Sequence, residues 1–93
     1  MALDVRSTPD SSSLLVEHAG KDVTALANAQ LRALKNLTRP RIDIDLRIGS
    51  DARGYILEVT KLRPDDVMPV DSILHGFKHE AHAKIGPWAG GGR

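Results

Sequence analysis

The sequence predicts a small single α+β domain, in which an antiparallel β-hairpin packs on helices in the order αββα. Two observations carry this prediction. Residues 41–48 alternate strictly between charged and aliphatic side chains, which is the pattern of a half-buried strand. Apolar residues recur at helical spacing over 22–37, before this strand, and over 72–85, after it.

The two ends of the chain differ in composition from the domain between them, which we place at 14–85. Residues 1–13 carry Ser, Thr, Pro and Asp with only isolated apolar residues, too few to bury the surface that folding requires. Residues 86–93 are rich in glycine. We therefore expect a flexible, extended arm at 1–13 and a Gly-rich C-terminal tail at 86–93.

The first helix is expected over 22–37, with an apolar stripe that faces the core. Asp22 is its expected N-cap, because a carboxylate at that position accepts from the first free backbone N–H groups. Pro40 ends the helix, since a proline disfavours the α conformation of the residue before it. The stripe consists of Val23, Leu26, Ala27, Leu34 and Leu37.

A hairpin follows, in which a turn joins 41–48 to a second strand at 55–62. Apolar residues on both faces of the second strand predict cover on two sides, by the domain's own helices or by another subunit. Two strands alone make a marginal sheet, so we expect the arms or a neighbouring subunit to complete it. The two faces of the second strand carry Tyr55, Leu57 and Val59 on one side, and Ile56 and Leu62 on the other.

The last helix is expected over 72–85. Two prolines and an acidic pair at 63–69 indicate a connector before it. Asp71 is the expected N-cap, and Gly86 followed by Pro87 is a typical helix end.

Composition limits the functions that the chain can have. Its 93 residues include 13 basic and 12 acidic side chains and no cysteine, so disulfides and thiolate metal sites are excluded. We expect no signal peptide and no membrane span, because the longest aliphatic run is only Leu14 to Val16. The expected location is the cytoplasm or an intracellularly assembled particle. Nucleotide-binding and nucleophile motifs are absent, so we expect no enzyme activity and no cofactor.

Three histidines on the last helix, His75, His79 and His82, are the most specific chemical feature. Their spacing places the imidazoles on one side of a helix, where a pair four residues apart can chelate a divalent ion. A solvated or partner-facing histidine stripe has the same pattern. A metal site is therefore an alternative hypothesis rather than the main one.

A basic strip is the second alternative, and it would make the protein a small regulatory module that contacts nucleic acid. Asp43 and Asp45 interrupt this strip and no aromatic residue lies near it, so we regard nucleic acid as an unlikely partner. The two aspartates fit better as part of a solvent-facing ladder of ion pairs. The strip consists of Arg32, Lys35, Arg39, Arg41 and Arg47.

Protein partners are the main expectation. Only three aromatic residues are present, so the core is filled by small aliphatic side chains and a partner surface would add what it lacks. The sequence thus predicts a non-enzymatic structural or interaction subunit that forms a homo-oligomer or joins a larger assembly. A small component of a viral particle or of a similar shell would fit the layout of a domain with an arm at either end, which small adaptor proteins share. The residues expected to contact partners are Trp88, Leu3, Val5, Ile56 and Leu62.

Overall fold

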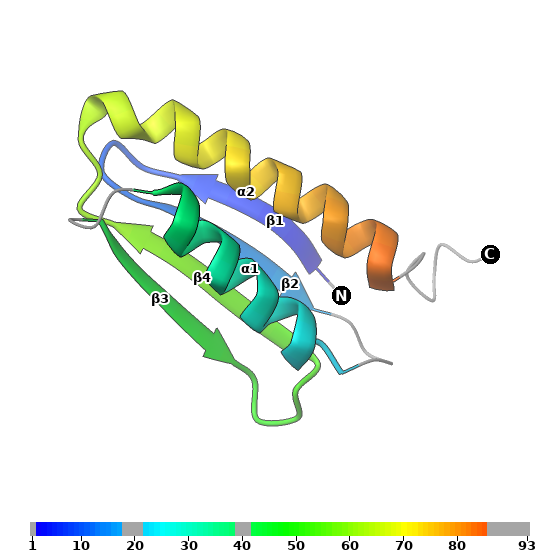
Figure 1. Cartoon of the computed structure of the whole chain (residues 1–93). Coiled ribbons are helices and arrows are strands. Elements are labelled where there is room, and N and C mark those ends of the chain that lie inside the picture. The colour runs from blue at the N-terminus through cyan, green and yellow to red at the C-terminus, as the bar shows by residue number, and fades with distance from the viewer. Residues whose placement is uncertain (1, 18–21, 39–41, 86–93) are drawn as a thin grey trace.

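The computed structural model describes residues 2–17, 22–38 and 42–85. It contains four strands and two helices in the order ββαββα (Figure 1). In chain order these are β1 (Ala2–Ser7), β2 (Ser12–Glu17), α1 (Thr24–Leu37), β3 (Asp43–Ile48), β4 (Gly54–Thr60) and α2 (Pro64–Ile85).

All four strands form one antiparallel sheet in the spatial order β1-β2-β4-β3. Both helices lie on the same face of this sheet, α2 over β1 and β2 and α1 over β4 and β3 (Figure 1). The opposite face carries no described element. The sheet therefore has one covered face, one open face, and two edge strands, β1 and β3.

The expected order αββα is wrong, because a hairpin formed by β1 and β2 precedes α1. Residues 2–7 lie in a strand where we expected a flexible arm. The two strands are joined by a tight turn in which the Thr8 N–H donates to the Ser11 carbonyl at 2.8 Å, and the Thr8 hydroxyl donates to Asp10 at 3.0 Å. Leu3 and Val5 of β1 pack against the core beside α2, so the first strand depends on the last helix of the chain, which begins at Pro64. The sheet is thus completed by the N-terminal segment.

The predicted hairpin of β3 and β4 is present, with Asp43 opposite Thr60 and Ile48 opposite Tyr55. One detail differs after β4. Lys61 has a φ of 62°, which interrupts the alternation and turns Leu62 into the core. Leu62 is therefore not on the outer face of the strand, as the uninterrupted pattern predicted.

The predicted first helix is also present. Asp22 accepts a hydrogen bond of 2.8 Å from the Thr24 N–H just before α1, as its capping role requires. At the other end, the Thr38 N–H and hydroxyl both donate to the Leu34 carbonyl, at 3.1 and 2.8 Å.

The last helix begins eight residues earlier than expected, at Pro64 rather than Ser72. A proline is favourable in the first turn of a helix, because its missing N–H has no helical partner there. The buried Asp66 carboxylate accepts from the Arg63 N–H at 3.1 Å, which is one half of a capping box. Asp71 is consequently an interior helix residue and not the N-cap. The expected tail at 86–93 lies outside the described residues.

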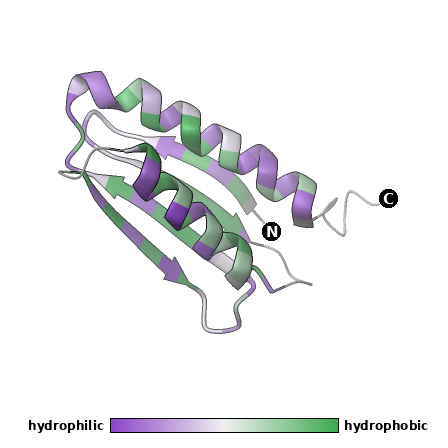
Figure 2. Ribbon diagram, in the orientation of Figure 1, coloured by the Kyte–Doolittle hydropathy of each residue, from purple (hydrophilic) through white to green (hydrophobic). Residues whose placement is uncertain are grey.

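The core lies between the helices and the covered face of the sheet, and both helices and all four strands contribute hydrophobic residues to it. Hydrophobic positions alternate or recur along these elements (Figure 2). The fully buried members of the core include Leu14, Leu57 and Leu74. The largest buried polar side chain, that of Gln30, lies among them with 1 % of the residue surface exposed. It lies in the inner stripe of α1, between Ala27 and Leu34.

Candidate interaction surface

The open face of the sheet is mostly polar with a small apolar centre. Alternation points every second residue of each strand away from the helices. On β2 and β4 these include Leu15 and Ile56, which lie directly opposite each other and are partly exposed. Ile56 lies on the face of β4 opposite Tyr55, as the alternation predicted, but no described helix provides the cover that was expected on this second face.

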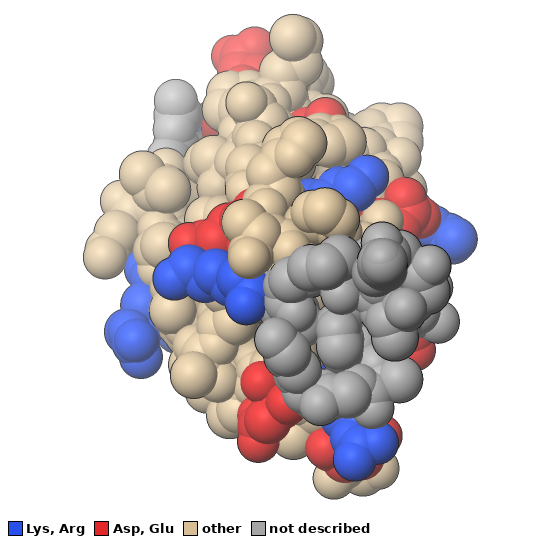
Figure 3. Space-filling view, turned by 90° about the vertical axis from the view of Figure 1, so that its right-hand side faces the viewer, with Lys and Arg blue, Asp and Glu red and all other residues tan. Residues whose placement is uncertain are grey.

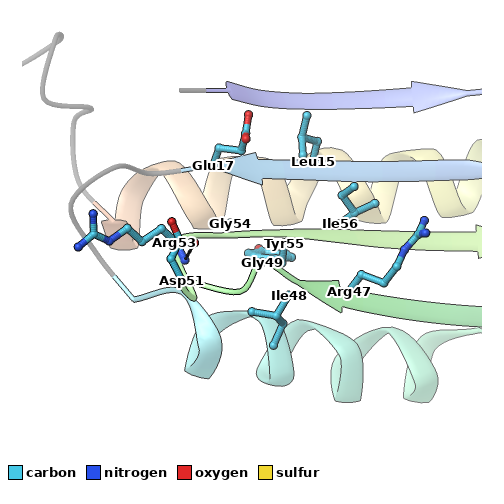
Figure 4. A pocket seen from close by; sticks show the side chains of 10 residues that line it. All are labelled: Leu15, Glu17, Arg47, Ile48, Gly49, Asp51, Arg53, Gly54, Tyr55 and Ile56. Atoms are coloured by element: carbon cyan, nitrogen blue, oxygen red, sulfur yellow. Dashed lines mark hydrogen bonds between the residues drawn. The ribbon is translucent and has the colours of Figure 1, made fainter.

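A shallow hollow of about 590 Å³ lies at one end of this face, beside the β3–β4 turn (Figure 4). Leu15 and Ile56 form its apolar part, whereas Ile48 points towards α1 (Figure 4). Its charged lining is balanced between two acidic and two basic side chains. The hollow consequently offers no excess of either charge to attract an ionic ligand. The charged residues are Glu17, Arg47, Asp51 and Arg53.

The outward-facing charges of β3 and β4 form a ladder of exposed ion pairs. Arg47 lies 3.6 Å from Asp45 and 3.6 Å from Glu58, and Lys61 lies 3.0 Å from Asp43. The predicted ladder is thus present in the geometry. Exposed pairs of this kind stabilise a fold by only about 0–1 kcal/mol each, so these charges remain available to a partner.

Both edge strands carry helix-side aliphatic residues that are partly buried against the core. On β1 these residues are Leu3 and Val5, and the Ser7 hydroxyl of this strand also donates to Asp71 on α2 at 2.6 Å. On β3, the three helix-side residues Ile44, Leu46 and Ile48 remain partly exposed along the whole strand. The outer edge of β3 therefore carries a continuous aliphatic row that the described part of the chain covers incompletely.

Most of the expected partner residues lie elsewhere than predicted. Leu3, Val5 and Leu62 belong to the protein's own core or pack against it. Trp88 lies outside the described residues. Ile56 alone of the five is described on the open face. The partly exposed aliphatic residues of β3, Ile44, Leu46 and Ile48, were not among the residues expected to contact partners. The strict alternation of 41–48 places these residues on one face of a strand, but it does not reveal whether that strand has one neighbouring strand or two.

The three histidines are exposed on α2. His75 lies 3.5 Å from Asp71 through Nε2, while His82 lies seven residues, or roughly 10 Å along the axis, from His75. Within 2–17, 22–38 and 42–85, no three His, Asp or Glu side chains are grouped so that they could hold a metal ion. The histidines are thus placed as a stripe rather than as a cluster.

The expected basic strip is divided between opposite sides of the molecule. Arg32 and Lys35 are exposed on α1, whereas Arg47 points away from α1 on the open face of the sheet. Arg39 and Arg41 lie outside the described residues. Acidic and basic groups are also interspersed on the end of the molecule drawn in Figure 3.

A buried polar network, which the sequence pattern did not indicate, connects the sheet to both helices. The Tyr55 hydroxyl of β4 donates to Gln30 Oε1 of α1. Gln30 Nε2 in turn donates to two oxygens of α2, the Phe77 carbonyl at 3.1 Å and Glu80 Oε1 at 3.0 Å. Burial, together with the nearby Glu80 charge, raises the pKa of Tyr55 well above its usual range. The network pairs the Tyr55 hydroxyl and the Gln30 amide with hydrogen-bond partners and so connects α1 to β4 and α2.

No described helix has the length and apolar content that crossing a membrane requires. No protein-family model, curated protein or solved structure matches the chain.

Proposed function

We propose that the protein is a non-enzymatic structural subunit that acts by assembly, with further copies of itself as its first partner. One observation carries this proposal: the aliphatic row of Ile44, Leu46 and Ile48 stays partly exposed along β3, an edge strand that pairs with β4 on one side and with no described strand on the other. An edge strand of this kind presents free backbone groups beside apolar surface, and both gain from a partner.

The composition of the core supports the same function. Within residues 2–17, 22–38 and 42–85, Tyr55 is the only aromatic side chain among the fully buried residues. Aromatic residues bury the largest areas, so this described core is thin for its size. Anything that binds the folded chain and not the unfolded one adds to its stability by mass action.

The experiment is the solution mass of the purified chain, measured by light scattering over a roughly hundredfold range of concentration. Assembly predicts a mass above that of the monomer, which rises with concentration, and a melting temperature that rises in parallel. A monomer at every concentration, with a constant melting temperature, contradicts self-assembly. Neither readout depends on knowing which surface makes the contact.

A further inference from the structure

The outer edge of β3 has backbone groups in the right positions to accept another strand. The Gly49 N–H donates to the Gly54 carbonyl of β4 at 2.8 Å. Because backbone groups alternate in direction along a strand, residues 43, 45 and 47 also face β4, and Ile44, Leu46 and Ile48 direct their N–H and C=O groups outwards. These three residues therefore present both the backbone groups that no described strand pairs and the partly exposed aliphatic row.

We propose that β3 pairs antiparallel with β3 of a second copy, about a two-fold axis at Leu46, so that the two four-stranded sheets become one continuous sheet. This proposal rests on the proposed function and names its partner surface. The axis is perpendicular to the sheet, so the helices of both copies lie on the same face. The aliphatic rows of the two strands then become neighbours beneath the two α1 helices.

Charge complementarity selects the register. With the axis at Leu46, Asp45 of each copy lies opposite Arg47 of the other, and Ile44 lies opposite Ile48. These Asp–Arg pairs occupy positions without backbone hydrogen bonds, where facing side chains are closest. Both side chains are well exposed, at 65 % for Asp45 and 64 % for Arg47, and are free to reorient towards the second copy.

Neighbouring registers place like charges opposite each other. An axis at Asp45 brings the two Asp45 carboxylates together, and an axis at Arg47 brings the two guanidinium groups together. An axis at Ile44 pairs Asp43 with Asp45. An axis between two residues would pair an even-numbered residue of one copy with an odd-numbered residue of the other. Such registers are excluded, because paired residues share a face of the sheet and the aliphatic row of one copy would then lie on the open face of the other. Of the registers centred within 44–47, only the one at Leu46 has two attractive pairs and no repulsive one.

Charge exchange tests this arrangement. Arg47→Asp places two carboxylates opposite each other on both sides of the axis, and Asp45→Arg does the same with two cations. Each variant should raise the dimer dissociation constant about tenfold or more, because two attractive cross-strand pairs become two repulsive ones. The double variant Asp45→Arg/Arg47→Asp restores both pairs and should restore the affinity to within about threefold of the original chain.

Two matched charge reversals serve as controls. Asp43→Arg reverses an exposed charge on the same strand. In this register Asp43 lies opposite the uncharged Gly49 of the second copy, so dimerisation should persist. Asp4→Arg makes the corresponding change on β1, whose Asp4 and Arg6 have the same spacing as Asp45 and Arg47 and lie 2.9 Å apart. It should also leave the dimer intact, which distinguishes the two edges.

Cysteine cross-linking measures the register directly, because the chain has no native cysteine. Opposed residues without backbone hydrogen bonds have Cα atoms about 4.5 Å apart, within the range that a disulfide spans. A mixture of Asp45→Cys and Arg47→Cys chains, mildly oxidised, should give far more disulfide-linked dimer than either variant alone. Both positions are exposed, so folding, checked by circular dichroism, should be unaffected.

The outcomes separate this inference from the proposed function. Loss of the dimer in the single charge reversals, rescue in the double variant and mixed-chain cross-linking support the β3 seam. An oligomer that withstands both reversals, or that Asp4→Arg dissociates, overturns the β3 seam while self-assembly stands. A monomeric wild-type chain overturns both.

Discussion

The buried network around Gln30 allows a quantitative test of the fold, through a double-mutant cycle. Gln30→Leu removes the acceptor of the Tyr55 hydroxyl. Tyr55 is buried, with only 2 % of its surface exposed, so water does not replace this acceptor. An unsatisfied buried polar group costs about 1–3 kcal/mol, so we expect a loss near 2 kcal/mol in the free energy of unfolding. For a domain of this size that corresponds to a fall of roughly 8–16 °C in the melting temperature.

The second arm of the cycle is Tyr55→Phe, which leaves Gln30 Oε1 without a donor and should cost about 1–2 kcal/mol. The double variant removes both partners of the bond. It should therefore be less destabilised than the sum of the single variants, by about 1–2 kcal/mol. Urea unfolding followed by circular dichroism gives all four free energies under one set of conditions.

A matched control replaces Asn36, an exposed residue on the same helix, with leucine. Asn36→Leu and Tyr55→Phe should be additive within about 0.5 kcal/mol, because they share no contact. If Gln30→Leu and Tyr55→Phe are also additive within that limit, the two side chains are not bonded and the argument for the network is refuted.

Three further predictions concern separate parts of the molecule. Gly76→Ala should stabilise the protein by about 0.5–1 kcal/mol in thermal unfolding, because the added methyl meets no atom within 4 Å and glycine is a poor helix former. The raised pKa of Tyr55 means that the folded state holds the phenol proton more tightly than the unfolded state; the resulting stability is intact below about pH 10 and is lost as the pH rises further. Because Tyr55 is the only tyrosine, tyrosinate absorbance should appear above the range of a free tyrosine and together with unfolding. Removal of residues 86–93, which include Trp88, should lower the mass of the assembly in light scattering if that tail is a second contact.

Each of these predictions has an outcome that contradicts it. A destabilised Gly76→Ala variant would mean that the exposed side of α2 is in fact covered. Tyrosinate formation near pH 10 in the folded protein would show that the Tyr55 ring is reached by solvent. An unchanged mass after removal of 86–93 would exclude the tail from assembly, whereas the β3 seam would be unaffected.

The parts of the fold that were predicted well are those with a strong local signal. The alternation over 41–48 identified β3, and the apolar stripe with Asp22 before it identified α1. The prolines at 64 and 69 misled the prediction of α2, because proline is compatible with the first turns of a helix as well as with a connector. Leu62 was misplaced for an equally local reason, since the positive φ of Lys61 leaves no mark on the hydrophobic pattern.

What the sequence by itself determined is the class of the domain, its charge balance, its lack of cysteine, and which residues of β3 and β4 share a face. These properties follow from composition and from periods of two and 3.6 residues, which are set by neighbours along the chain. Only the tertiary structure decided that residues 2–17 form a hairpin, that Gln30 meets Tyr55, and that β3 is an edge strand. The physical reason is that pairing between distant segments depends on which surfaces remain to be buried once all elements are present, and no local pattern contains that information.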